Sequence, residues 1–138
     1  MAVAPLYLAD KSALARLHHR PVARRLGPLL VDGLVATTPI IDLEVLYSPR
    51  SLADYEEILA ERGALPSFPL TPEVTDHAID IQRRLAQLGR HRLPLPDLLI
   101  AAVAGLNDLA VIHYDADYDR VAEVTGQPCE WVVPRGSL

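Results

Sequence analysis

Five acidic residues of this chain stand in or beside apolar stretches, where a carboxylate needs a partner. They are Asp10, Glu44, Asp97, Asp115 and Asp117. Carboxylates that converge with no basic residue among them repel one another strongly unless a cation neutralises them. Ligation by oxygen alone suits Mg²⁺ or Mn²⁺ better than zinc. Such an ion can hold a phosphodiester, activate a water and stabilise the leaving oxygen, so convergence of these acids would indicate phosphodiester chemistry.

Four short, nearly continuous apolar stretches predict the strands that would bring these acids together. They cover residues 6–9, 34–37, 109–112 and 131–133. Continuity rather than alternation is typical of strands that are covered on both faces, as in a parallel sheet. Asp10 directly follows the first stretch, and Asp115 and Asp117 closely follow the third. Ligand sites form beyond the carboxyl ends of parallel strands, so these acids should share one edge if the two strands are adjacent.

Helical patterns separate the predicted strands. Ser12, as a cap, opens a first short pattern, and Thr38-Pro39 and Thr71-Pro72 each offer a cap followed by proline in the first helical position. The later helices are expected over residues 39–46, 52–62, 72–88, 98–106 and 119–124, with Gly63 and Gly126 as left-handed caps after two of them. Strands that alternate with helices predict an α/β fold, a three-layer α/β/α sandwich around a central, mainly parallel sheet.

The composition excludes several classes of protein. With 138 residues, 50% of them hydrophobic, the chain fits one domain over residues 1–138. The one cysteine, Cys129, allows no internal disulfide and no Cys-based zinc cluster. The longest apolar run, residues 98–106, is less than half of the roughly 20 residues that a membrane span requires. Asp10 and Lys11 interrupt the apolar start before a signal-peptide core forms. We therefore expect a cytoplasmic protein with no membrane association.

The net charge argues against a basic coat for nucleic acid but not against RNA binding. Thirteen Lys and Arg stand against eighteen Asp and Glu, which gives a formal charge of −5. Setting the five proposed acids aside from the eighteen leaves thirteen, which equals the number of basic residues. Two groups of basic residues could contact phosphates, unless they are only solvated helix faces. One is Arg83, Arg84, Arg90, His91 and Arg92, and the other is Arg16, Arg20, Arg24 and Arg25.

Each acid also has an ordinary structural explanation. Asp97 can cap the apolar helix that follows it, because free amides and the helix dipole favour a carboxylate at a helix N-terminus. Asp115 and Asp117 can be loop acids, with Asp117 as the cap of the last helix. Asp10 can be a turn residue between a strand and a helix. Glu44 is harder to explain in this way, because its neighbours are apolar. The metal-site hypothesis therefore depends on the combination of all five.

Four pieces of the chain form a recognisable combination. They are a hydrophobic strand running into Asp10-Lys11-Ser12-Ala13-Leu14, an internal Glu44, the segment Leu95-Pro96-Asp97-Leu98-Leu99-Ile100-Ala101-Ala102, and the segment Val111-Ile112-His113-Tyr114-Asp115-Ala116-Asp117-Tyr118. Together they resemble the PIN-domain family, and closely its bacterial VapC toxins of toxin-antitoxin pairs. No single piece is specific to the family, but the four together, in the order and spacing that the family shows, form a strong signal. The resemblance covers essentially the whole chain, including the closing residues 131–134.

The resemblance implies a PIN-like fold and a Mg²⁺- or Mn²⁺-dependent endoribonuclease. The implied acidic quartet is Asp10, Glu44, Asp97 and Asp115, with Asp117 as an accessory acid near the metal. Ser12 would be a polar helper. His113 stands where relatives frequently carry Thr or Ser, and this departure concerns a hydroxyl contact rather than the acidic site. A contact between His113 and a substrate phosphate is left open.

The family resemblance also implies a substrate, partners and a mechanism. Members typically cut single-stranded regions of structured RNA and leave a 3′-hydroxyl and a 5′-phosphate. A cognate VapB-type antitoxin usually neutralises the toxin, often by inserting a basic side chain among the acids, and the toxins commonly form homodimers. We expect Asp10, Asp97 and Asp115 to bind the metal directly. Glu44 would ligate it or orient its water, and Asp117 would help to hold a second ion or the waters of the first.

Two other functions fit the same residues. The acids could form a docking pocket for a basic segment of a partner, in a binding module without activity. The site could also serve another metal-dependent phosphotransfer enzyme, such as a DNA nuclease or a phosphatase. Cleavage tested on RNA, DNA and a small phosphate ester with the same metal separates the three. The repulsion among the acids favours the ribonuclease over the binding module, because it is costly to keep without a cation.

Overall fold

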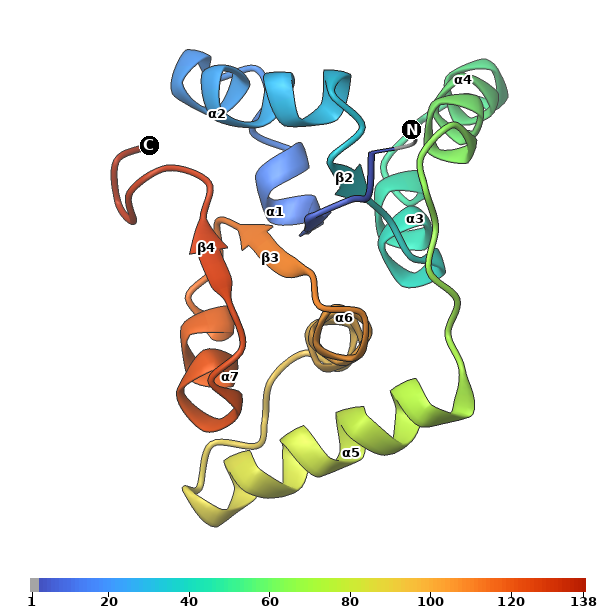
Figure 1. Ribbon diagram of the computed structural model, residues 1–138. Helices are drawn as coiled ribbons and strands as arrows, with labels where there is room; N and C mark the ends of the chain where they lie inside the picture. The colour runs from blue at the N-terminus through green and yellow to red at the C-terminus, as the bar shows by residue number, and fades with distance from the viewer. Residues whose placement is uncertain (1–2) are drawn as a thin grey trace.

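The structure, a computed structural model, describes residues 3–138 and centres on a four-stranded parallel sheet (Figure 1). Its strands are β1 (Tyr7–Ala9), β2 (Val35–Ala36), β3 (Ala110–His113) and β4 (Cys129–Trp131), in the order β2-β1-β3-β4. All neighbouring strands are parallel, and Leu8 of β1 lies beside both Ala36 and Val111. The predicted parallel sheet is confirmed, and the strands that lead to Asp10 and Asp115 are neighbours.

Seven helices within residues 3–138 cover the two faces of this sheet. They are α1 (Lys11–Leu14), α2 (Arg20–Val31), α3 (Pro39–Leu46), α4 (Leu52–Gly63), α5 (Pro72–Gln87), α6 (Leu95–Leu106) and α7 (Asp117–Thr125). Leu8 and Ala36 pack toward α3, α5, α6 and α7, whereas Ala9 and Val35 pack toward α1 and α2. Because successive residues of a strand point to opposite faces, a sheet covered on both sides shows continuous apolar runs. The predicted α/β/α sandwich is confirmed.

Helix α6 is the most deeply buried helix and lies between the sheet and α5 (Figure 1). All of its residues from Asp97 to Ala104 are buried except Leu99. Helix α5 covers it with the single apolar face that the sequence predicts, formed by Val74, Ala78, Ile81 and Leu85. No helix among residues 3–138 is both long and apolar enough to cross a membrane. The packing of α6 therefore fixes the position of the one charged residue on it, Asp97.

The two helices that carry the candidate acids begin earlier than the sequence predicts. Helix α6 starts at Leu95 rather than after Asp97, because Pro96 is well tolerated in the first turn of a helix. Helix α7 starts at Asp117 rather than at Asp119, with Ala116 as its N-cap. Asp97 and Asp117 therefore lie inside their helices, and their explanation as helix caps is wrong.

Three predicted element ends are also corrected. The N-cap of α1 is Asp10, whose carboxylate accepts the backbone N–H of Ser12, rather than Ser12 itself. Gly63 is the last residue of α4, and the cap after it, Ala64, is right-handed at φ −81°. Strand β4 ends at Trp131, two residues before the predicted end, although residues 132–133 are buried and the N–H of Val132 still donates to the carbonyl of His113. Gly126, at φ 69°, is the left-handed cap that the sequence predicts.

Helix α2 has no counterpart among the predicted helices. Its sequence contains Pro21, Gly27 and Pro28, which disfavour a helix interior. Pro21 lies in the first turn, where its missing N–H does no harm, whereas Pro28 lies in the last turn. Val22 and Leu26 are fully buried beneath the helix. Tertiary packing of these two side chains therefore outweighs the local propensity.

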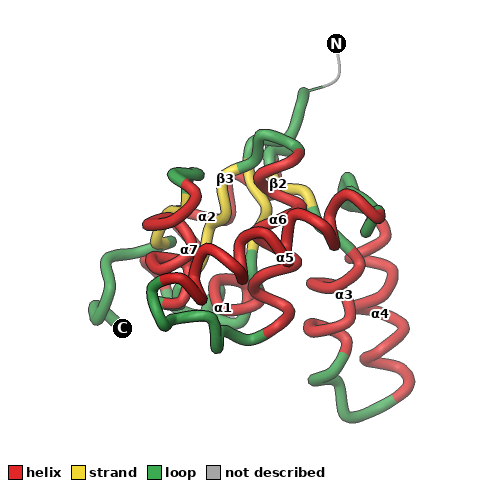
Figure 2. Tube along the Cα trace, turned by 90° about the horizontal axis from the view of Figure 1, so that it is seen from below, coloured by secondary structure: helices red, strands yellow, loops and turns green. Residues whose placement is uncertain are grey.

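Helices α3 and α4 form a pair at one side of the molecule, joined by a buried charge network (Figures 1 and 2). The Arg62 side chain of α4 is only 9% exposed. Its Nε donates to Asp42 Oδ1 at 2.9 Å, and its Nη2 donates to Thr37 Oγ1 at 2.7 Å. Thr37 Oγ1 donates in turn to Asp42 at 2.8 Å. Arg62 thereby holds α4 against the start of α3 and the chain that follows β2.

Substitution Arg62→Met should lower the free energy of unfolding by about 2–3 kcal/mol, because it leaves the Asp42 carboxylate without its buried cation. Urea denaturation of the purified protein measures this change. The control is Arg84→Met, which removes an exposed ion pair with Asp80 and should cost less than about 1 kcal/mol. Equal losses in the two variants would contradict a structural role for the Arg62 network.

Candidate active site

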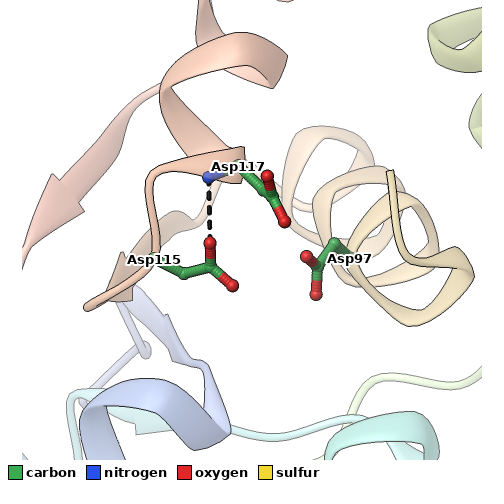
Figure 3. A group of neighbouring side chains, drawn as sticks. All are labelled: Asp97, Asp115 and Asp117. Atoms are coloured by element: carbon green, nitrogen blue, oxygen red, sulfur yellow. Dashed lines mark hydrogen bonds between the residues drawn. The ribbon is translucent and has the colours of Figure 1, made fainter. Parts of the chain in front are cut away.

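Three carboxylates converge beyond the carboxyl ends of β1 and β3. Each of Asp97, Asp115 and Asp117 places one oxygen within 4.8 Å of the others (Figure 3). Asp97 comes from the first turn of α6, Asp115 from the loop after β3, and Asp117 from the first residue of α7. Figure 3 shows the carboxylate of Asp97 facing the other two. The structure therefore brings together three of the acids that the sequence singles out.

The loop between β3 and α7 is held tightly by its own hydrogen bonds. The N–H of Asp117 donates to Asp115 Oδ1 at 2.9 Å, and the N–H of Asp115 donates to His113 Nδ1 at 3.1 Å. These bonds fold the loop back on itself and fix the Asp115 carboxylate beside the start of α7. The side chain of His113 thus holds the backbone of this loop at Asp115.

Asp10 adjoins the three acids at the end of β1. Its Oδ2 accepts hydrogen bonds from the backbone N–H and the hydroxyl of Ser12. The Ser12 hydroxyl also accepts the N–H of Tyr114 at 2.9 Å. Ser12 therefore fixes the Asp10 carboxylate and ties it to the end of β3, which gives a physical basis for the polar role expected of this serine.

Tyr118 is a member of this site that the sequence does not single out. Its hydroxyl lies 2.8 Å from Asp10 Oδ1 and 3.5 Å from Asp97 Oδ1, and its side chain is fully buried. Burial, followed by the charges of Asp10 and Asp97, raises the pKa of Tyr118 well above its ordinary value. The hydroxyl therefore stays protonated and donates its hydrogen bond to the carboxylates of Asp10 and, at the longer distance, Asp97. In the sequence, nothing separates this residue from an ordinary core tyrosine of α7.

Glu44 lies on α3 at the margin of the group rather than inside it. Its Oε1 is buried and has no hydrogen-bond partner among residues 3–138. Burial first, and then the charge of Asp10, raise the pKa of Glu44, while Lys11 opposes the rise. Glu44 also contributes to the raised pKa of Asp97. It is therefore electrostatically coupled to the acids without belonging to the set within 4.8 Å.

Among these acids, Asp97 has the most strongly raised pKa. Burial, and then the charges of Asp10 and Asp115, raise the pKa of Asp97 to about 8. Its Oδ2 is buried and has no hydrogen-bond partner among residues 3–138. Burial and the charge of Asp115 also raise the pKa of Asp117, although Arg120 opposes this rise. Such a site favours either a bound proton or a bound cation on Asp97.

The donor set fits a divalent cation that prefers oxygen. The three converging groups are all carboxylates, and two buried oxygens, one on Asp97 and one on Glu44, have no hydrogen-bond partner among residues 3–138. A soft or nitrogen-preferring ion would be expected to recruit Cys or His ligands. The residues therefore fit Mg²⁺ or Mn²⁺, with Asp97, Asp115 and Asp117 as the nearest carboxylates and Asp10 beside them.

His113 cannot touch a substrate in this conformation, because its side chain is fully buried. Its ring lies 4.9 Å from that of Tyr118 and 5.0 Å from that of Trp131. Burial lowers the pKa of His113, which favours the neutral ring, and Nδ1 accepts the backbone N–H of Asp115. What the structure shows for His113 is a buried ring that accepts the backbone N–H of Asp115.

Trp131 and Cys129 make structural contacts near the end of the sheet. Trp131 packs against His113 and donates its indole N–H to Asp119 at 3.0 Å. Burial raises the pKa of the Cys129 thiol to about 12, so the group stays protonated near neutral pH. Cys129 instead packs against the apolar core.

In protein freed of divalent ions, the stability should fall as the pH rises from about 4 to 8. The pKa of Asp97 is raised from 3.8 to about 8 in the folded chain, so the folded chain binds a proton that the unfolded chain releases in this window. The substitution Asp97→Asn removes this proton linkage. Thermal melts in EDTA should therefore show a melting temperature at pH 8 that is about 5 °C higher for Asp97→Asn than for wild type. Parallel curves for the two proteins would disprove the raised pKa.

Comparisons with known proteins identify the family to which this chain belongs. Residues 7–124 match the model of the PIN domain. The chain is 44% identical over 135 residues to Ribonuclease VapC51 of Mycobacterium tuberculosis H37Rv, with 96% of each chain covered. It is 44% identical over 133 residues to Ribonuclease VapC21 of M. tuberculosis CDC 1551, covering 95% of this chain and 96% of that protein.

Solved structures share the fold at low sequence identity. VapBC2 from Rickettsia felis, bound to a DNA fragment from its promoter, superposes with a TM-score of 0.74 at 16% identity, covering 91% of this chain and 98% of that chain. A toxin-antitoxin complex from Klebsiella pneumoniae gives 0.72 at 17% identity, covering 92% and 98%. Family model, relatives and fold agree, so this chain belongs to the PIN domain family, among the VapC ribonucleases.

Proposed function

We propose that this chain is a Mg²⁺- or Mn²⁺-dependent endoribonuclease toxin that hydrolyses RNA phosphodiester bonds and is neutralised by a cognate VapB-type antitoxin. The observation that carries the proposal is the buried, unpartnered oxygen of Asp97 within a group of three carboxylates. Such a group is costly for a folded chain unless a cation completes it. The strong similarity to proteins named ribonucleases supplies the substrate class.

Asp97, Asp115 and Asp117 would hold the cation, with Asp10 beside them. When bound, the ion would neutralise charge on the phosphate and lower the pKa of a coordinated water. The remaining work falls to side chains of the protein. Glu44 is suited to accept a hydrogen bond from the attacking water and to take its proton, because its Oε1 has no partner among residues 3–138 and its pKa is raised by burial.

Ser12 and Tyr118 hold the Asp10 carboxylate from its two ends. Ser12 donates to Oδ2 and Tyr118 donates to Oδ1. A carboxylate fixed in this way loses little conformational freedom when it binds an ion, which favours tight and specific binding. Tyr118 is thus a positioning residue in this proposal, because it acts through Asp10 and Asp97.

The proposed partners follow from the family. The structural neighbours include toxin-antitoxin complexes, and an acidic group of this kind can receive one basic side chain from a bound antitoxin. A homodimer is proposed on the same family basis. Co-purification with the product of a small adjacent gene would support the toxin role. Full ribonuclease activity in its presence would contradict neutralisation.

Substitution Asp97→Asn should lower the rate of RNA cleavage at least about 100-fold in the presence of Mg²⁺, because it removes a charged ligand while keeping the shape of the side chain. Cleavage of single-stranded RNA on denaturing gels measures the effect, with DNA and a small phosphate ester tested alongside. Asp76→Asn, at an exposed position of α5, is the matched control and should cut at the wild-type rate. A folded Asp97→Asn protein that cuts as fast as wild type would refute the proposal.

Substitution Tyr118→Phe should raise the Mg²⁺ concentration needed for half-maximal cleavage by about tenfold, because the hydroxyl no longer orients Asp10. The stabilisation of the protein by Mg²⁺ in thermal melts should weaken in parallel, which tests ion binding without reference to activity. Tyr114→Phe is the control, since its hydroxyl only accepts N–H groups near the C-terminus. The positioning role is wrong if both variants show the wild-type dependence on Mg²⁺.

A further inference from the structure

A basic hollow of about 520 Å³ lies between α7 and the connection from α5 to α6. It is lined by Gly89, Arg90, Arg92 and Arg120. Figure 1 shows this connection rising beside α7 before it enters α6. In a chain with a net charge of −5, three guanidinium groups around one hollow form a marked local concentration of positive charge.

The backbone forms this hollow through the end of α5. Gly89, at φ 69°, adopts a left-handed conformation that other residues enter only with strain. Its N–H donates to the carbonyl of Ala86, and the N–H of Arg90 donates to the carbonyl of Leu85. The chain therefore turns away from the helix at this point. Leu93, which is buried, then anchors the connection on the core before α6 begins.

The charge in the hollow is only partly compensated. Arg90 Nη1 lies 2.9 Å from Glu123 Oε2, which ties the connection to α7. Within residues 3–138, neither Arg92 nor Arg120 lies in an ion pair, and both are exposed. Guanidinium groups are well suited to bind phosphate oxygens in pairs. The hollow therefore offers two free cations to an anionic ligand.

The hollow is linked to the candidate active site through Arg120, whose charge acts on Asp117. Arg120 lies three residues after Asp117, so the two side chains are neighbours on the surface of α7. Arg92 lies five residues before Asp97, in the connection that leads into α6. An extended polyanion bound at the acids would therefore span about one helical turn of α7 to reach Arg120.

We propose that Arg90, Arg92 and Arg120 form a subsite for a backbone phosphate of single-stranded RNA next to the bond that is cut. This inference rests on the ribonuclease function proposed above and adds a binding site to it. Among residues 3–138, the hollow is lined by Gly89 and three arginines with no aromatic or amide side chain, so the proposed contact is to the phosphate and carries no base preference.

The other basic residues of the chain are less suited to this role. Arg16 donates to the carbonyl of Ser12 and lies over the ring of Tyr114, and Arg25 pairs with Glu130. Arg20 and Arg24 are exposed on α2, and neither is among the residues that line the hollow between α7 and the α5–α6 connection. These two residues therefore provide a matched control of equal charge.

The test is RNA binding by protein that carries Asp97→Asn to prevent cleavage. The double substitution Arg92→Gln and Arg120→Gln should weaken binding of a fluorescent single-stranded RNA of about 20 nucleotides by about tenfold in anisotropy titrations. The slope of log affinity against log salt should shrink by about 0.7, because one phosphate contact is lost. Lysine at both positions should restore the slope, because it keeps the charge.

The control carries Arg20→Gln and Arg24→Gln, and it should bind RNA as the parent does. Equal affinity and equal salt slope in the two double variants, with unchanged melting temperatures, would overturn the phosphate subsite. Failure of the ribonuclease proposal is read separately, from the rates of RNA cleavage by the wild-type and Asp97→Asn proteins, both with their arginines intact. The two ideas can therefore fail independently.

Discussion

Mutual repulsion among carboxylates at the edge of the sheet is the constraint on which the rest of the structure depends. Burial and neighbouring charges raise the pKa of Asp97 to about 8, so the folded chain holds this group at a free-energy cost. The packing of α6 between the sheet and α5 offsets that cost, because α6 is apolar on nearly every side. The free energy gained by packing the core therefore compensates for the repulsion among the carboxylates.

Adjacency of β1 and β3 decides which acids meet. Parallel pairing aligns the ends of these strands, so Asp10 and Asp115 emerge at the same edge. Three side chains then refine the position of the acids. Ser12 and Tyr118 act on the Asp10 carboxylate, and His113 acts on the backbone of Asp115. Each of these tethers is buried or half-buried, where a hydrogen bond is electrostatically stronger than in water.

The sequence predicts the sheet and the acids better than it predicts what surrounds them. Continuous apolar runs indicate strands covered on both faces, and polar residues at their ends indicate a site, because both follow from local patterns. Helix α2 could not be predicted, since the burial of Val22 and Leu26 outweighs Pro28 only in the folded chain. Tyr118 could not be predicted either, because its role depends on a distance to Asp10, more than a hundred residues away along the chain.

Placement of the basic hollow beside the acids follows from the same electrostatics. Cations spread among the carboxylates would lower their pKa values and compete with a metal ion for them. Cations placed too far away would be screened, because the Debye length is about 8 Å at physiological ionic strength. Arg120, one turn along α7 from Asp117, lies between these extremes, and its effect on the pKa of Asp117 is small enough to leave that pKa raised. In the proposed function, a chain of net negative charge can therefore attract RNA at one point without placing a cation of its own among the acids.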